Sequence, residues 1–323
     1  MTTVTETAVE ALLTDTTTTR VRPRYEGSNI STWIGFKHIN YMVEEVVLEH
    51  FRQAGLSARG LYEEHGLGLD IVGLDTRILQ SFHMDDLVDA EVVPNTKEGD
   101  HTFGFKVTLS VERDGEVQKA STSKVRVSLR VDTYLEEAGE IPAALSRFAV
   151  DRLGTDSERE PAADAGPRDE VLERLLEGKN AYGWKWTIPY PYCHFTERLQ
   201  MSGYLRLMEE AKDRFVADRG ISIKTLLDER RWIPAVPRSD IRILDEALME
   251  EDLYTVYEVE EIFKDFTYTS RVDWYVVRDG RLLKTATGRI VHGYAVIANR
   301  RDWSLEHFDQ RVMDALNNKA QQG

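Results

Sequence analysis

An internal repeat constrains the fold of this chain more than any other feature of the sequence. The stretches LDTRIL and SDIRIL contain Arg77 and Arg242, which lie 165 positions apart in a chain of 323 residues. At the same offset RDG recurs at 113–115 and 278–280, and the identities are roughly three times as many as average residue usage predicts. Further identical pairs are Tyr25 and Tyr190, Glu44 and Glu209, Glu45 and Glu210, Gly55 and Gly220, and Ser57 and Ser222. Solenoid repeats are only about 20–50 residues long, so this longer period indicates two copies of a domain.

Both copies predict the same order of elements. Each has a short extended opening, a long helix that ends at a glycine, a short helix and four strands. The predicted ranges are 20–25, 39–54, 57–65, 68–79, 87–95, 102–113 and 116–132 in the first copy, and 185–193, 202–219, 222–231, 234–244, 253–263, 267–278 and 281–297 in the second. Asp-Gly between two β-rich runs is typical of a tight hairpin, so RDG is expected to join the last two strands of each copy. A helix followed by an antiparallel meander is an α+β plan.

Three segments lie outside the copies. The Thr-rich start, 1–19, is low in complexity and is expected to be a disordered tail. Residues 151–179 are polar and contain Pro, Gly and many acidic residues, which is typical of a linker. The two domains are therefore expected at 20–150 and 180–300, with a final helix within 301–323.

Composition narrows the classes of function. The formal charge of −15 argues against nucleic-acid binding, which normally needs a basic face. No apolar run approaches the roughly 18 residues of a membrane helix, and the N-terminus has no secretory signal pattern. Cys193 is the single cysteine, so no disulfide can form within the chain and a cytoplasmic location is expected. We find no metal-ligand spacing, phosphate loop or dinucleotide fingerprint, and therefore predict no metal and no cofactor.

The element order and the helix pattern YLRLMEEAKDRF resemble the 4-hydroxybenzoyl-CoA thioesterase-like branch of the hotdog fold, which belongs with the acyl-ACP thioesterases. The second copy matches the helix motif of that family at Tyr204, Leu205, Glu209, Glu210 and Ala211, and the first copy keeps Glu44 and Glu45. The resemblance covers about 20–135 and 180–297. It implies two hotdog domains in tandem, each a curved antiparallel sheet wrapped around a long central helix. Such a chain would form the usual hotdog pair internally, which leaves a further homodimer open.

The resemblance also implies an activity. The implied activity is hydrolysis of an acyl thioester that is carried by CoA or by an acyl carrier protein. The protein would then be an acyl thioesterase of polyketide or fatty-acid-derived metabolism. In the resembling enzymes the thioester lies between two hotdogs, and the N-terminal end of the central helix polarises its carbonyl. A carboxylate then attacks the carbonyl or activates water.

The expected carboxylate is missing from both copies. Counting back from Tyr204 by the family spacing places it at His194, and the offset carries that position to Asn29. His194 can exchange a proton near neutral pH, and Glu197 can act as a base or orient the histidine. We therefore predict His194, Glu197 and Asn29 as catalytic residues and Thr196 as a substrate-binding residue. The alternative interpretation is that Thr196 and Glu197 only cap the following helix.

Four more residues are predicted to bind substrate: His38, Asn40, Tyr190 and Tyr204. His38 and Asn40 lie near the start of the first long helix, where a loop would line the cleft, although His38 also fits a packing role. Tyr190 belongs to the aromatic cluster WKWTIPYPYCHF, which either forms a wall for an apolar acyl chain or fills the interface between the hotdogs. Tyr204 belongs to the helix motif that carries the resemblance.

The recurring charged residues have a structural explanation as well. Glu44 and Glu209 lie on the two long helices, and Arg77 and Arg242 recur with them, so structural ion pairs account for all four. Cys193 lies next to His194, but adjacent residues of a strand point to opposite faces, which disfavours a catalytic thiolate.

Two alternatives to hydrolysis remain open at the level of the sequence. Without the family's acid, the cleft could instead guide cyclisation or dehydration of a polyketide-like chain. A degenerate hotdog could also bind an acyl or polyene ligand without turning it over. Fold alone does not decide among these functions.

Overall fold

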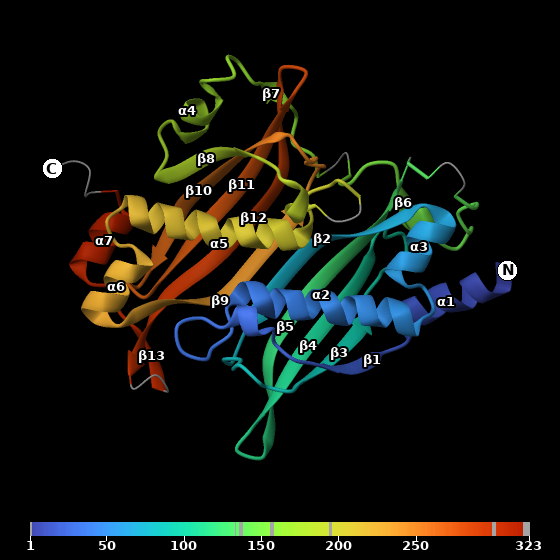
Figure 1. The fold of residues 1–323 in the computed structure, drawn as a ribbon, viewed down its shortest axis with the longest axis horizontal. Coiled ribbons are helices and arrows are strands. Elements are labelled where there is room, and N and C mark those ends of the chain that lie inside the picture. The colour runs from blue at the N-terminus through green and yellow to red at the C-terminus, as the bar shows by residue number, and fades with distance from the viewer. Residues whose placement is uncertain are drawn as a thin grey trace.

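The computed structural model describes residues 2–132, 134–135, 138–155, 158–193, 196–298 and 302–318. Two long helices, α2 (Phe36–Gln53) and α5 (Met201–Asp218), lie against the same face of one large sheet (Figure 1). The two helices begin and end 165 positions apart, which is the offset of the sequence repeat.

Each half of the chain has the same set of elements around its long helix. The first half contains β1 (Thr17–Val21), α3 (Ala58–His65), β2 (Leu67–Ile78), β3 (Val88–Pro94), β4 (Phe103–Arg113) and β5 (Glu116–Val131). The second half contains β8 (Ala181–Thr187), α6 (Ile223–Arg230), β9 (Trp232–Ile243), β10 (Asp252–Phe263), β11 (Thr267–Arg278) and β12 (Arg281–Ala298). The predicted RDG hairpins join β4 to β5 and β11 to β12. Their Asp114 and Asp279 adopt positive φ angles of 53° and 50°, as the hairpin turn requires.

The two halves share one continuous sheet. Its strand order is β1-β3-β4-β5-β2-β9-β12-β11-β10-β8, so β2 and β9 form the seam. Across the seam Asp75 pairs with Asp240, and Gly73 pairs with Arg242. Asp75 and Asp240 are equivalent in the repeat, so the pairing is symmetric about them and the halves are related by a pseudo-two-fold axis.

Periodicity in the sequence explains why these elements form. Along β4, buried and more accessible side chains alternate, so one face of the strand turns toward the core. In α2, Val43, Val46 and Val47 are fully buried, with spacings of three and four residues that place them on one helix face. Each half of the sheet thus wraps around the apolar face of its own long helix, α2 or α5 (Figure 1). This confirms the predicted α+β fold of two hotdog domains in tandem.

The start of the chain corrects the prediction of a disordered tail over 1–19. Residues Thr2–Thr14 form a helix, α1, and β1 pairs with β3. Leu12 of α1 is fully buried in the core of the first half. The buried ring of His50 bridges the two elements, because its Nδ1 is 2.9 Å from Thr17 Oγ1 and its Nε2 is 3.1 Å from the Leu12 carbonyl oxygen. Low complexity did not prevent this segment from burying apolar side chains.

The linker and the C-terminal segment also contain more structure than predicted. The short strand β6 (Ala149–Val150) precedes the linker. The linker itself contains β7 (Ala163–Asp164) and α4 (Val171–Leu176), whose Val171 and Leu175 pack against Tyr254 and Val256 of β10. The expected single helix within 301–323 is instead β13 (Asp302–Glu306), which pairs with β12, followed by α7 (Gln310–Leu316). Asp309 begins α7 by accepting a hydrogen bond from the Val312 N–H at 2.9 Å. None of the described helices is long and apolar enough to cross a membrane.

Candidate functional site: a cavity between the halves

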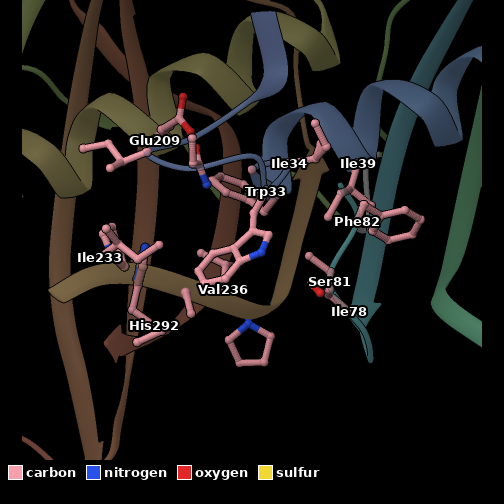
Figure 2. A pocket seen from close by; sticks show the side chains of 18 of the residues that line it. Trp33, Ile34, Ile39, Ile78, Ser81, Phe82, Glu209, Ile233, Val236 and His292 are labelled. Carbon is pink, nitrogen blue, oxygen red and sulfur yellow. The ribbon is translucent and has the colours of Figure 1, made fainter. Parts of the chain in front are cut away.

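A cavity of about 620 Å³ opens where the two halves meet. The first half contributes the loop before α2 and the segment that follows β2, and the second half contributes α5, β9 and β12. Figure 2 shows the indole of Trp33 between Val236 of β9 on one side and Ile34 and Ile39 on the other. The volume and the largely apolar lining suit a drug-sized or acyl ligand.

Trp33 organises the wall of the cavity. Its side chain is 7% exposed and clusters with Ile233, Ala295 and Ile297 of the second half. The backbone hydrogen bonds that hold its loop include those from Asn29 N–H to the Trp33 carbonyl at 2.6 Å and from Gly35 N–H to the Gly27 carbonyl at 3.0 Å. The apolar part of the cavity is therefore shared between the halves.

The N-terminal end of α2 reaches this cavity. Gly35 is the N-cap residue, and Gly35 and Phe36 both line the cavity. A side chain at position 35 would place its Cβ 3.0 Å from Asn29 Oδ1, so the glycine leaves room for the amide of Asn29. The N–H groups at a helix start carry partial positive charge, and most lack an intrahelical acceptor. In α2 the His38 N–H donates to the Gly35 carbonyl at 3.0 Å, whereas those of Phe36 and Lys37 have no partner among the described residues. This end of α2 can therefore stabilise a negatively charged oxygen.

Two acidic side chains of α5 line the cavity, Glu209 and Asp213, and Glu209 is the one that reaches this end of α2. Glu209 Oε2 is 2.7 Å from Nζ of Lys37 in the first turn of α2. The two side chains are 31% and 17% exposed, so solvent still reaches the carboxylate. The structural ion pair that the sequence offered for Glu209 therefore exists, but with Lys37 and not with Arg242.

Two buried polar groups complete the second-half wall. His292 of β12 is 1% exposed, and burial, together with the nearby charge of Lys212, lowers its pKa well below the usual range of histidine. Lys212 of α5 is itself buried and pairs with Asp213. The imidazole is therefore neutral at pH 7. Figure 2 shows His292 next to Ile233, on the second-half side of the cavity.

In the described part of the chain, charged side chains occupy the cleft that the pseudo-two-fold axis relates to this one, which we call the filled cleft. Arg198 and Asp70 stand at the positions equivalent to Trp33 and Ala235, and they form an ion pair of 2.7 Å with side chains only 5% and 3% exposed. A second pair, between Arg130 and Glu246 at 2.6 Å, lies close to it. Charged side chains thus occupy the space that remains open at Trp33.

The predicted catalytic residues fall on both clefts. Asn29 lines the open cavity, whereas Thr196 and Glu197 belong to the loop of the filled cleft. Thr196 Oγ1 accepts a hydrogen bond from Gln200 at 3.1 Å, and the exposed Tyr134 hydroxyl donates to the Glu197 carboxylate at 2.9 Å. His194 lies outside the described residues. The catalytic roles of Asn29, His194 and Glu197 and the substrate-binding role of Thr196 stay predictions.

The other predicted substrate-binding residues do not line the open cavity. Asn40 is fully buried, donates to the Phe36 carbonyl at 3.0 Å and accepts from Thr76 at 2.6 Å. His38 is buried against the ring of Tyr41.

Tyr204 and Tyr190 also lie apart from the cavity. The ring of Tyr204 is fully buried against Trp274, and Tyr190 is 74% exposed. Burial raises the pKa of the Cys193 thiol to about 11, which agrees with the argument against a catalytic thiolate.

Trp33, Glu209 and His292 were not predicted as site residues. The recurrence of Glu44 and Glu209 was a usable signal for one of them, because it pointed to a carboxylate on each central helix. Trp33 and His292 are not repeated in the other half, where Arg198 and Val127 stand at the equivalent positions. A search for identities therefore passes over both.

Solved structures with a similar fold cover most of the chain. A Lactobacillus plantarum protein described as an oleoyl thioesterase is 12% identical, with a TM-score of 0.58, over 86% of this chain and 95% of its own. An acyl-ACP thioesterase from Bacteroides thetaiotaomicron is 8% identical, with a TM-score of 0.53, over 86% of this chain and 97% of its own. The 12:0-ACP thioesterase from Umbellularia californica is 10% identical, with a TM-score of 0.54, over 90% of this chain and 94% of its own.

At such low identity these structures define the class of fold and nothing finer. No protein-family model matches the chain, and no curated protein sequence matches it. The chain is therefore a double-hotdog protein, with the architecture of the solved acyl-ACP thioesterases.

Proposed function

We propose that this protein hydrolyses an acyl thioester carried by CoA or by an acyl carrier protein, and that the Trp33 cavity holds the acyl group. One observation carries the proposal: the apolar cavity between the halves is lined at one place by both the N-terminal end of α2 and an accessible carboxylate, that of Glu209. The names of the structural neighbours, which are thioesterases, agree with this class of reaction.

The geometry supports a direct hydrolytic mechanism. The acyl chain lies along Trp33, and the thioester carbonyl turns toward the first-turn N–H groups of α2, which stabilise the oxyanion. Glu209 accepts a proton from a water molecule while the water oxygen bonds to the carbonyl carbon. The C–S bond then breaks, and the leaving sulfur takes the proton from Glu209. The amide of Asn29 orients the carbonyl or the water, because an amide cannot accept the proton at neutral pH.

The test compares two equivalent glutamates. Purified protein is incubated with a panel of acyl-CoA and acyl-carrier-protein thioesters, and free thiol is followed with a chromogenic reagent. We expect Glu209→Gln to lower kcat by about 100-fold or more, since a general base contributes at least that factor.

Glu44→Gln is the matched control for this assay. Glu44 holds the same position on α2, and burial raises its pKa to about 7, with a further rise from Glu45. The control should leave kcat within about twofold. Equal rates for wild type and Glu209→Gln would remove Glu209 from the mechanism, and a wild type that releases no thiol from any substrate would overturn hydrolysis. Glu197→Ala in the same assay tests the filled cleft.

A binding protein without turnover is the second candidate. It is favoured by one observation, namely that Asn29 and His194 stand where the resembling enzymes carry an acid. Release of no thiol, together with an acyl or polyene ligand found by mass spectrometry in the purified protein, would support it. A product that keeps its thioester but changes its absorbance would instead support cyclisation or dehydration.

A further inference from the structure

The cavity contains a polar group that the proposed hydrolysis does not use. His292 lines the cavity, is 1% exposed, and neither of its ring nitrogens has a hydrogen-bond partner among the described residues. Buried polar side-chain atoms are normally paired, and an unpaired one lowers stability. An unpaired imidazole in the wall of a cavity therefore points to a ligand atom as its partner.

Comparison with another buried histidine sharpens this point. His50 of α2 is equally buried at 1% exposure, yet both of its ring nitrogens are within hydrogen-bond distance of protein oxygens. His292 stacks on Tyr268 with ring centroids 5.2 Å apart, but stacking uses the face of the ring and gives neither buried nitrogen a hydrogen-bond partner. A phenylalanine would stack equally well, so packing does not explain why position 292 is polar.

The asymmetry between the clefts leads to the same conclusion. Val127 is the residue equivalent to His292, and Val47 is the residue equivalent to Lys212. Both polar side chains therefore occur only at the open cleft, whereas the filled cleft has valines in their places. The polar wall accompanies the cavity and is not a general requirement of the fold.

We propose that His292 forms a subsite for an oxygen atom on the acyl group, so that the substrate class is an acyl thioester with a hydroxyl or keto group and not a plain saturated chain. This inference rests on the proposed function for the presence of an acyl group in the cavity. A neutral imidazole has one donor and one acceptor nitrogen, so it can donate to a keto oxygen or accept from a hydroxyl. Lys212 forms an ion pair with Asp213, so the imidazole of His292 is the uncharged hydrogen-bonding group in this wall of the cavity.

The experiment uses free fatty acids, which bind without being hydrolysed. Dissociation constants are measured by calorimetry for dodecanoate and for a series of dodecanoates that carry one hydroxyl or one keto group along the chain. We expect wild type to bind at least one oxygenated acid about tenfold more tightly than dodecanoate, as expected when a hydrogen bond satisfies a buried polar group. His292→Val should abolish the preference and leave the affinity for dodecanoate unchanged.

Three further experiments distinguish a loss of ligand recognition from a loss of folding. Valine is the residue that the chain itself uses at position 127, and circular dichroism with thermal unfolding shows whether the variant is folded. His292→Gln, which keeps a donor and an acceptor, should restore part of the preference. Nitrogen-15 spectra of the imidazole should shift with the preferred acid and not with dodecanoate.

The outcomes distinguish this inference from hydrolysis. Equal affinity of wild type for all the acids would overturn the subsite, and so would an equal loss of affinity for plain and oxygenated acids in His292→Val. If the preference exists but no thioester releases thiol, the subsite stands and the proposed hydrolysis fails.

Discussion

Trp33 and Arg198 hold equivalent positions in the two halves, and each determines what its cleft contains. Trp33 contacts apolar side chains and lines a cavity, whereas Arg198 reaches Asp70 and excludes solvent. A buried ion pair adds little net stability, but loss of one partner leaves an unpaired charge in the interior. Replacing either Arg198 or Asp70 alone should therefore lower the stability of the protein, whereas replacing both together should lower it much less.

We expect Arg198→Ala to lower the free energy of unfolding by about 3–5 kcal/mol. The double variant Arg198→Met with Asp70→Ala should recover most of this loss, because neither charge of this pair remains buried without its partner. Urea denaturation monitored by fluorescence measures both. Arg59→Ala is the control, since its pair with Glu63 is 82% and 56% exposed and its loss should leave the free energy of unfolding almost unchanged. A double variant no more stable than Arg198→Ala would contradict this explanation.

At the scale of the elements, α1 extends the hydrophobic core of the first half beyond the sequence repeat. Its counterpart in the second half is the shorter α4, which precedes β8 and packs against β10 as α1 packs against β3. The α1 helix is attached through Leu12 and through the hydrogen bonds of His50, so its loss should affect the whole domain and not only the terminus.

Leu12→Ala tests this attachment. Leu12 is fully buried, and removal of a buried leucine side chain costs about 2–5 kcal/mol of folding free energy. Glu10→Ala, on the exposed side of the same helix, should change the free energy of unfolding by less than about 0.5 kcal/mol. Equal unfolding midpoints for wild type and Leu12→Ala would mean that α1 does not contribute to the core in solution.

At the scale of the whole molecule, the seam between the halves places two like charges opposite each other. Asp75 pairs directly with Asp240 across β2 and β9. Burial raises the pKa of Asp240, and Asp75 raises it further. Arg238 offsets part of the repulsion by pairing with Asp75 at 3.1 Å.

Asp240→Asn should therefore stabilise the protein at neutral pH, by about 0.2–1 kcal/mol. A raised folded-state pKa means that the favourable contribution of Asp240 is complete below its unfolded-state pKa and is lost as pH rises through the folded-state value. The advantage of the variant should accordingly be present at pH 7 and disappear near pH 3. Thermal unfolding at both pH values measures it. Asp75→Asn is the control, and its gain in stability should be smaller because this variant also loses the ion pair with Arg238. A stability advantage of Asp240→Asn that is larger at pH 3 than at pH 7 would contradict the repulsion between Asp75 and Asp240.

The repeat accounts for how much of the fold was predictable. Identities at one offset predicted α2 and α5, β2 and β9, and the RDG hairpins, because main-chain architecture depends on patterns that both copies keep. At that offset there are no identities over α1 or β13, so the repeat did not predict them.

The site was predictable only in part, for a different physical reason. Asn29 was identified from the family spacing, and it does line the cavity. Which cleft stays open depends on buried side chains that differ between the halves, such as Trp33 against Arg198. The volume left by such side chains is set by three-dimensional packing, and pattern matching along the chain does not report it.

The single strand-to-strand seam at β2 and β9 has one more consequence. In an assembly of two identical chains, any substitution appears in both grooves at once, so neither groove can lose its opening while the other keeps it. Covalent fusion removes that restriction. In this protein a buried ion pair occupies one groove, and the residues of the other groove can change independently of it.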